Sequence, residues 1–259
     1  MHRSRRMLFI NSTLAFVTAF FLTTFIHEGG HFIAYLLSGA HPVMYHNYVQ
    51  TPAQLSTGVE VIGSLAGPLI SLLQGIVFGL IVYRKPGNSA GDLLMLWLSL
   101  LGFINFFGYL LLTPLSTVGD TGKAAELLQI GYPWRILTAA VGISVLIILV
   151  IRTGKYFTNF IPPERDLAAK KGYINSVLFF PILAGSVVNV AFAFPVPAAL
   201  SVIYPATSSF AIMMAFGTVL RTAPMVNSGS KTGKRVSGML LVMLPACIII
   251  NRLLTLGLR

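Results

Sequence analysis

Charge is the scarcest property of this chain of 259 residues. Charged residues make up 10% of it and only seven are acidic, whereas hydrophobic residues make up 55%. This balance excludes an ordinary soluble domain, in which about a quarter of the residues are charged. Several apolar runs exceed the roughly 18 residues that mark a membrane helix, so the sequence predicts an all-α, multi-spanning integral membrane protein with about six to seven transmembrane helices in the lipid bilayer.

Cysteine is nearly absent as well. Cys247 is the single one, so the chain cannot form an intrachain disulfide. The small-x-small pattern of a signal-peptidase site is also lacking after the first apolar run, which continues through Leu37. We therefore expect this run to be a retained helix rather than a cleaved signal peptide.

Basic residues are more frequent, and they are unevenly placed. The net charge of +11 would suggest nucleic acid in a soluble protein, but no stacking aromatic residues are interleaved with the basic clusters, which argues against that partner. If every apolar run crosses the membrane once, all but four of the 18 lysines and arginines fall on the N-terminal side. The four are Lys123, Arg135, Arg252 and Arg259. The positive-inside rule then predicts a cytoplasmic N-terminus.

Seven apolar segments are candidate helices. They cover about residues 8–38, 59–83, 92–114, 134–151, 174–194, 198–220 and 236–257. Residues 39–58 are polar but uncharged and predict a loop or short hairpin at the membrane interface. In the second segment, Gly67 and Pro68 predict a local interruption of the helix. Small residues at every fourth position, from Gly63 to Gly79, predict close packing against a neighbouring helix.

The first apolar segment contains the motif His-Glu-Gly-Gly-His at residues 27–31, and Glu28 is the single charged residue between positions 7 and 59. His27 and His31 lie four residues apart, on one face of a helix, where two imidazoles can share a zinc ion. Glu28 can reach a water molecule on that ion. Because a carboxylate in apolar surroundings is costly unless it is paired or functional, we interpret the motif as a metal site rather than as two buried structural histidines.

A catalytic zinc ion typically has three protein ligands and one open position, so a third ligand must come from outside the motif. The extended zincin motif would need a histidine where this chain has Leu37. Asp120 follows the third apolar segment and is expected at a membrane depth similar to that of the histidines, which makes it the preferred candidate. Glu60, His41 and His46 remain alternatives, and the carboxylate at position 120 could instead cap a following helix.

Three motifs together resemble the site-2 protease family of intramembrane zinc metalloproteases. They are residues 27–31 in an apolar helix, Ala66-Gly67-Pro68-Leu69 in the next segment, and Asn105 followed downstream by Pro114 and Gly119-Asp120. The third motif is more widely spaced than is usual in the family, and Thr121 follows Asp120 where a glycine is usual. The resemblance covers roughly residues 10–130.

This resemblance implies a zinc metalloprotease-like membrane core of three helices in residues 1–130 and a C-terminal transmembrane bundle of unknown role in residues 131–259. It implies a zinc-dependent intramembrane endopeptidase that hydrolyses peptide bonds of membrane-associated protein or peptide substrates. The implied site residues are the Zn2+ ligands His27, His31 and Asp120, the general base Glu28, and Asn105, which could hold the substrate backbone or a ligand.

A different class of function is also open. A catalytically inactive or metal-binding membrane scaffold, or a transporter, could keep the metal site or only the fold, since transporters use broken helices with polar groups at the membrane midplane. Glu28 favours the enzyme, because pure metal binding gives it no purpose.

The charge distribution also places the site toward the outside, whereas well-known relatives place it toward the cytoplasm.

Overall fold

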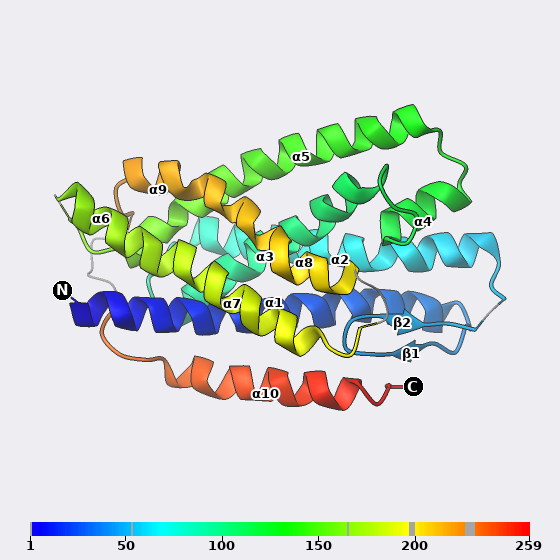
Figure 1. Ribbon diagram of the computed structural model, residues 1–259, viewed down its shortest axis with the longest axis horizontal. Coiled ribbons are helices and arrows are strands. Elements are labelled where there is room, and N and C mark those ends of the chain that lie inside the picture. The colour runs from blue at the N-terminus through cyan, green and yellow to red at the C-terminus, as the bar shows by residue number, and fades with distance from the viewer. Residues whose placement is uncertain (1, 53, 165, 197–199, 226–230) are drawn as a thin grey trace.

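The computed structural model describes residues 2–52, 54–164, 166–196, 200–225 and 231–259. Within these residues, every regular element except one two-stranded hairpin is a helix, which confirms the predicted all-α class. Six of the described helices are long and apolar enough to cross a membrane. They run mostly along the long axis of the molecule (Figure 1). By length and composition, these helices suggest a membrane protein.

Some of the six candidate spans are built from more than one element. They are α1 (His2–Leu37), α2 (Thr57–Arg84), α3 (Ala90–Leu112), α5 (Tyr132–Gly154) with a 3-10 helix (Lys155–Phe160), α6 (Leu167–Ile174) joined to α7 (Phe180–Ala193) by a π-helix (Asn175–Phe179), and α8 (Leu200–Thr207) joined to α9 (Phe216–Arg221) by a 3-10 helix (Ser208–Ala215). Two helices are shorter, α4 (Asp120–Leu127) and α10 (Gly238–Leu254).

The predicted segments agree with these elements. Helices cover most of the described residues of each apolar segment, although the seventh segment is helical only at Gly238–Leu254; positions 198 and 199 of the sixth segment lie outside the described residues. The seventh, α10, has 17 residues and is shorter than the six spans. Between α1 and α2, strands β1 (Val43–Met44) and β2 (Val49–Gln50) form an antiparallel pair, which confirms the short hairpin.

Helix α1 contacts several other helices of the bundle. Helices α2, α3, α7 and α10 pack around it (Figure 1). Phe16 of α1 is fully buried and meets Trp97 of α3 edge to face, with 5.0 Å between the ring centroids. On the α7 side, a β-carbon at Gly185 would overlap the ring of Phe16. The ring of Phe16 thus packs against Gly185 of α7 on one side and the ring of Trp97 on the other. This close packing holds α3 and α7 against α1.

The small-residue stripe on α2 is a packing face, as predicted. A β-carbon at Gly63 would overlap the ring of Tyr35 from α1, and one at Gly75 would lie 2.6 Å from the ring of Phe103 from α3. Helix α2 therefore touches its neighbours through its backbone, and α1 and α3 approach it on either side.

The predicted interruption at Gly67 and Pro68 is wrong, because α2 continues through both residues. Membrane helices tolerate proline when neighbouring helices and side chains compensate for the lost backbone bond. Proline has no N–H, so the carbonyl of Ser64, four residues earlier, lacks its usual helical donor. The helix thus stays intact, although it loses one internal hydrogen bond.

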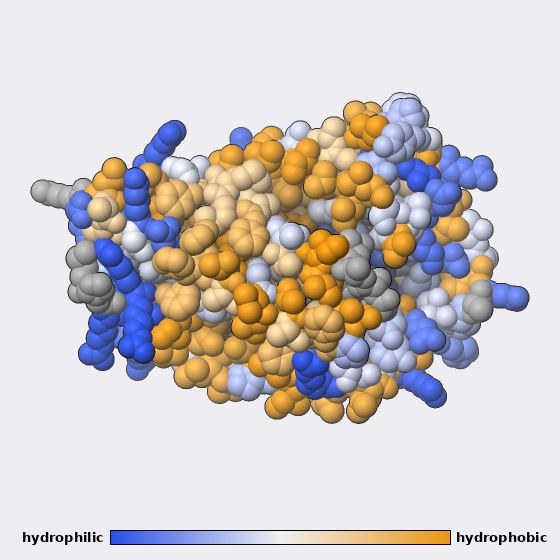
Figure 2. Space-filling model, in the orientation of Figure 1, coloured by the Kyte–Doolittle hydropathy of each residue, from blue (hydrophilic) through white to orange (hydrophobic). Residues whose placement is uncertain are grey.

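Basic loops gather at the N-terminal end of α1. Arg5 donates to the carbonyl of Ala169 over 3.3 Å, and the amide of Asn11 donates to the carbonyls of Thr232 and Arg235 over 2.6 and 2.8 Å. Figure 2 shows hydrophilic residues concentrated at this end, on the left, beside a broad apolar band across the middle of the molecule. Such a division is typical of a protein whose middle is embedded in hydrocarbon.

Candidate metal centre

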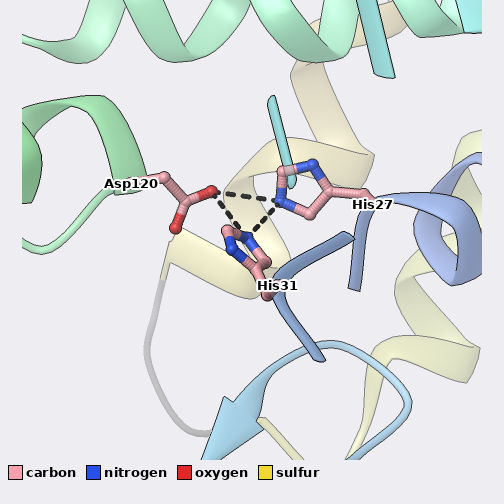
Figure 3. Close-up of side chains that lie close together, drawn as sticks. All are labelled: His27, His31 and Asp120. Carbon is pink, nitrogen blue, oxygen red and sulfur yellow. Dashed lines mark hydrogen bonds and ion pairs between the residues drawn. The ribbon is translucent and has the colours of Figure 1, made fainter. Parts of the chain in front are cut away.

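Three potential metal ligands meet between α1 and the start of α4. His27 and His31 are buried on α1, and Asp120, the first residue of α4, is partly buried. One ligand atom of each lies within 4.8 Å of the other two. Figure 3 shows the two rings and the carboxylate pointing toward one another. This group could hold a metal ion.

The ligand atoms form a compact triangle. Asp120 Oδ2 lies 3.0 Å from His27 Nε2 and 3.3 Å from His31 Nε2, and the two nitrogens are 3.1 Å apart. Ligands bound tetrahedrally to zinc at about 2.0–2.1 Å are separated from one another by roughly 3.3 Å. Small shifts of the side chains would therefore place all three atoms in the first coordination sphere of one ion.

Hydrogen bonds behind the rings determine which nitrogens can bind a cation. Nδ1 of His31 lies 2.7 Å from the carbonyl of Gly63, which only accepts, so this nitrogen carries the proton. Ser71 donates its hydroxyl to the carbonyl of Gly67 over 3.0 Å, so its oxygen accepts the proton on Nδ1 of His27 over 3.2 Å. In both neutral rings the Nε2 atom is then left with a lone pair.

The three facing atoms are thus all electron-pair donors, and a cation between them would stabilise the group. Metal-binding histidines commonly donate their second ring N–H to a carbonyl or another oxygen, as both rings do here. Burial by itself raises the pKa of the Asp120 carboxyl, but when the rings carry protons on Nε2 in place of a metal ion, a positive charge on His31 and hydrogen bonds from both rings lower this pKa below the usual range. A metal cation in the same place would act in the same direction.

The first turn of α4 orients the Asp120 side chain toward the two histidines. The N-cap residue of α4 is Gly119, and no side chain caps this helix. Thr121 donates its hydroxyl to the carbonyl of Tyr109 over 2.7 Å and shares a second hydrogen bond of 2.7 Å with Thr113. These bonds attach the first turn of α4 to the end of α3. The carboxylate at position 120 faces the imidazoles, whereas a capping carboxylate would bond the backbone of its own helix.

The other candidates for the third ligand lie apart from this group. Glu60 pairs with Lys123 over 3.6 Å, which connects α2 to α4. His41 is exposed, and His46 lies with Nε2 2.9 Å from the carbonyl of Ala193, so that it donates to α7. Within the described residues, Asp120 is the carboxylate that joins the two histidines.

A cavity of about 450 Å3 opens beside the metal-binding group. The structure brings all five predicted site residues to its wall, namely His27, Glu28, His31, Asn105 and Asp120. Glu28 is buried, and the Oδ1 atom of Asn105 has no hydrogen-bond partner within the described chain. The cavity therefore holds a possible metal site, a carboxylate outside the ligand set and a free amide oxygen together.

Tyr109 is a site residue that the sequence analysis missed. Its ring stacks on that of His27, with 5.2 Å between the centroids and 4° between the planes, and it also lines the cavity. The available signal was its spacing of four residues from Asn105, which places both side chains on one face of α3. Tyr204 of α8 continues the stack, with 6.3 Å between the centroids.

The cavity wall extends beyond the first 130 residues. Asn189 of α7, Tyr204 of α8 and Asn251 of α10 all line it. From the sequence alone, the role of this half of the chain was unknown. The structure shows that the C-terminal helices help to enclose the space beside the candidate metal site.

Comparison of the chain with models of known protein families, with curated proteins and with solved structures found no match. The resemblance to site-2 proteases therefore stays a prediction that rests on the motifs. Any functional inference has to start from the geometry and the chemistry of the site.

Proposed function

We propose that this protein is a zinc-dependent intramembrane endopeptidase that hydrolyses peptide bonds of membrane-associated substrates. The observation that supports it best is the convergence of His27, His31 and Asp120 beside a cavity that also contains Glu28. Two nitrogen ligands and one oxygen ligand, with a cavity beside them for a fourth, suit a catalytic zinc site better than a closed structural one. The proposal also agrees with the resemblance of the motifs to those of site-2 proteases.

The residues of the cavity can divide the work of peptide hydrolysis. Zinc, when bound, would supply a Lewis acid for the scissile carbonyl and for the attacking water. Glu28 would accept a proton from that water and deliver it to the departing amine. Asn105 would accept a backbone N–H of the substrate at its free Oδ1. Tyr109 would keep the ring of His27 in its plane by stacking on it.

The test measures metal content and cleavage in the same preparation. Full-length protein in detergent micelles is assayed for zinc and for hydrolysis of a helical membrane peptide. Glu28→Gln keeps the shape of the side chain but cannot act as a base, so turnover should fall by about a hundredfold or more while the zinc content stays unchanged. Glu126→Gln is the matched control, because Glu126 pairs with Arg135 over 2.8 Å and does not line the cavity.

The possible results separate the two classes of function. Full cleavage by Glu28→Gln would contradict the mechanism. Zinc bound stoichiometrically to the wild-type protein without cleavage would favour a metal-binding scaffold or transporter instead.

The proposed orientation has the N-terminus in the cytoplasm. The basic residues support it, since all but four of the 18 fall on that side. Lys171→Cys in a Cys247→Ser background provides one cysteine in the basic loop. A membrane-impermeant maleimide should label it in inverted vesicles but not in intact cells, and the reverse pattern would invert the topology.

A further inference from the structure

The C-terminal helices contribute a second set of polar groups to the cavity. Asn189 of α7 and Asn251 of α10 both line it and are only 3% and 4% exposed. Neither the Oδ1 nor the Nδ2 atom of Asn189 has a hydrogen-bond partner in the described part of the chain, and the same holds for Oδ1 of Asn251. Buried polar atoms in folded proteins are nearly always paired. Unpaired amides on a cavity wall therefore indicate that another molecule completes their hydrogen bonds.

Contacts of α7 with α1 before and after Asn189 fix the part of the helix that carries this residue. One turn earlier, Gly185 lies so close to Phe16 of α1 that a β-carbon would overlap the ring. About one turn later, Phe192 packs against Phe21, also of α1, with 5.8 Å between the ring centroids. Between these contacts, α7 cannot rotate to expose the amide to solvent.

The hairpin between α1 and α2 extends the same polar surface. His46 and Asn47 line the cavity, and both donate to the carbonyl of Ala193 at the end of α7, over 2.9 and 3.1 Å. Within the described residues, Nδ1 of His46 and Oδ1 of Asn47 have no partner. Apart from the metal-binding group, Glu28 and Lys123, the polar side chains of the wall are thus neutral donors and acceptors.

The chemistry of these groups identifies what they would bind. A carboxamide presents an N–H donor and a C=O acceptor, which complement the C=O and N–H of a peptide group. A helical substrate has already used its backbone groups internally, so only an unwound segment can pair with them. In apolar surroundings such a segment needs a partner for every backbone group it exposes. The hydrocarbon chain of a lipid offers nothing to pair with an amide.

We propose that Asn189 and Asn251 form a backbone-binding subsite for an extended segment of the peptide substrate. This inference rests on the proposed endopeptidase function and gives the C-terminal bundle a role in holding the substrate beside the metal site. The two asparagines would form hydrogen bonds with backbone N–H and C=O groups that become unpaired when the substrate helix unwinds.

The experiment measures binding without turnover. A short, uncharged, fluorescein-labelled apolar peptide is titrated with full-length, zinc-loaded Glu28→Gln protein in micelles, and the anisotropy is followed. Adding Asn189→Leu or Asn251→Leu should raise the Kd about tenfold. Ser186→Ala is the matched control, because Ser186 is also buried on α7 with an unpartnered hydroxyl but does not line the cavity. Its Kd should not change.

A second series changes the peptide backbone. N-methylation of alternate backbone nitrogens removes N–H donors from the peptide and should also raise the Kd about tenfold. With Asn189→Leu the methylated and unmethylated peptides should differ less. If a leucine variant does not fold, which its thermal unfolding would reveal, Asn189→Ala or Asn251→Ala takes its place in both series.

Three results would overturn the subsite. They are equal Kd values for Asn189→Leu, Asn251→Leu and Ser186→Ala, equal affinity for methylated and unmethylated peptides, and no measurable binding of the peptide. The readout is independent of hydrolysis. If binding depends on Asn189 but the wild-type protein cleaves no substrate, the endopeptidase proposal is overturned and the subsite is kept. If the wild-type protein cleaves its substrate but binding does not depend on Asn189, the subsite is overturned and the endopeptidase proposal is kept.

Discussion

Gly67 of α2 lies directly against the imidazole of His31, so that a β-carbon at position 67 would overlap the ring. The ring rests on the backbone of α2, and its Nδ1 atom donates to the carbonyl of Gly63 over 2.7 Å. The stripe of small residues on α2 is therefore both a packing face and the support for one of the proposed metal ligands. A larger residue at this position would have to push the ring away.

Gly67→Ala should displace His31 and lower the affinity for zinc by about 10- to 100-fold, as expected when the groups that orient a ligand are lost. Alanine favours helix formation over glycine, so the helix itself should not suffer. Competition with a chelating dye measures the affinity. Gly29→Ala is the control within the metal-binding motif, because a β-carbon there would meet nothing within 4 Å. Equal affinities of the two variants would contradict the role of Gly67.

Ser71→Ala should weaken zinc binding by a similar factor of about 10 to 100. The hydroxyl of Ser71 accepts from Nδ1 of His27 over 3.2 Å, and without it this ring loses the bond that sets its tautomer and its direction. Ser99→Ala removes a comparable bond, from a buried serine to the carbonyl of Gly75 over 2.9 Å, but Ser99 does not line the cavity and forms no hydrogen bond with either histidine in the described structure. It should leave zinc binding unchanged, and a loss as large as that of Ser71→Ala would indicate a general packing effect.

The sequence predicted those parts of the site that depend on local geometry or on span length. His27 and His31 share a helix face whatever surrounds them, because four residues make about one turn. Asp120 was preferred because its depth follows from the number of residues in the preceding span. The predicted helix interruption at Pro68 was wrong because, in a helix packed between neighbouring helices, a proline costs only one backbone hydrogen bond.

The remaining parts of the site depend on how helices face one another. The contact between Gly67 and His31 follows from the rotation of α2 against α1, which the sequence pattern does not specify. Asn189 and Asn251 lie on different helices, and their spacing along the chain does not predict that they line the same cavity. The spacing of Tyr109 from Asn105 could be seen in the sequence. A tyrosine in an apolar helix is common, however, and its stacking on His27 could not be predicted from the sequence.

Asp120→Ala should abolish stoichiometric zinc binding, because it removes the oxygen that lies 3.0 and 3.3 Å from the two Nε2 atoms. Glu60→Gln is the matched variant of the competing carboxylate, and it should bind zinc as the wild-type protein does. Glu60 pairs with Lys123, so only this ion pair of 3.6 Å would be lost. Metal analysis of the purified proteins measures both. Full occupancy in Asp120→Ala, or loss of zinc in Glu60→Gln, would move the third ligand elsewhere.

The hairpin should loosen on acidification through the protonation of His46. Burial lowers the pKa of His46 below its usual 6.5, and the nearby Arg252 acts in the same direction, although the hydrogen bond to Ala193 opposes them. The unfolded hairpin therefore takes up a proton at a higher pH than the folded one does. Its stability is complete above about pH 6.5 and falls as the pH drops below that value.

Hydrogen exchange at the amide of Met44, which donates to the carbonyl of Leu258 over 2.8 Å, reports this loosening. After correction for intrinsic exchange, protection should stay constant between about pH 7.5 and pH 6.5 and decrease from about pH 6.5 to pH 5.5. His46→Gln can still donate to Ala193 but cannot be protonated, so its protection should not change over this range. His41→Gln alters an exposed histidine and should keep the dependence of the wild-type protein. The same pH dependence in His46→Gln would show that another group is responsible, since glutamine has no proton to gain in this range.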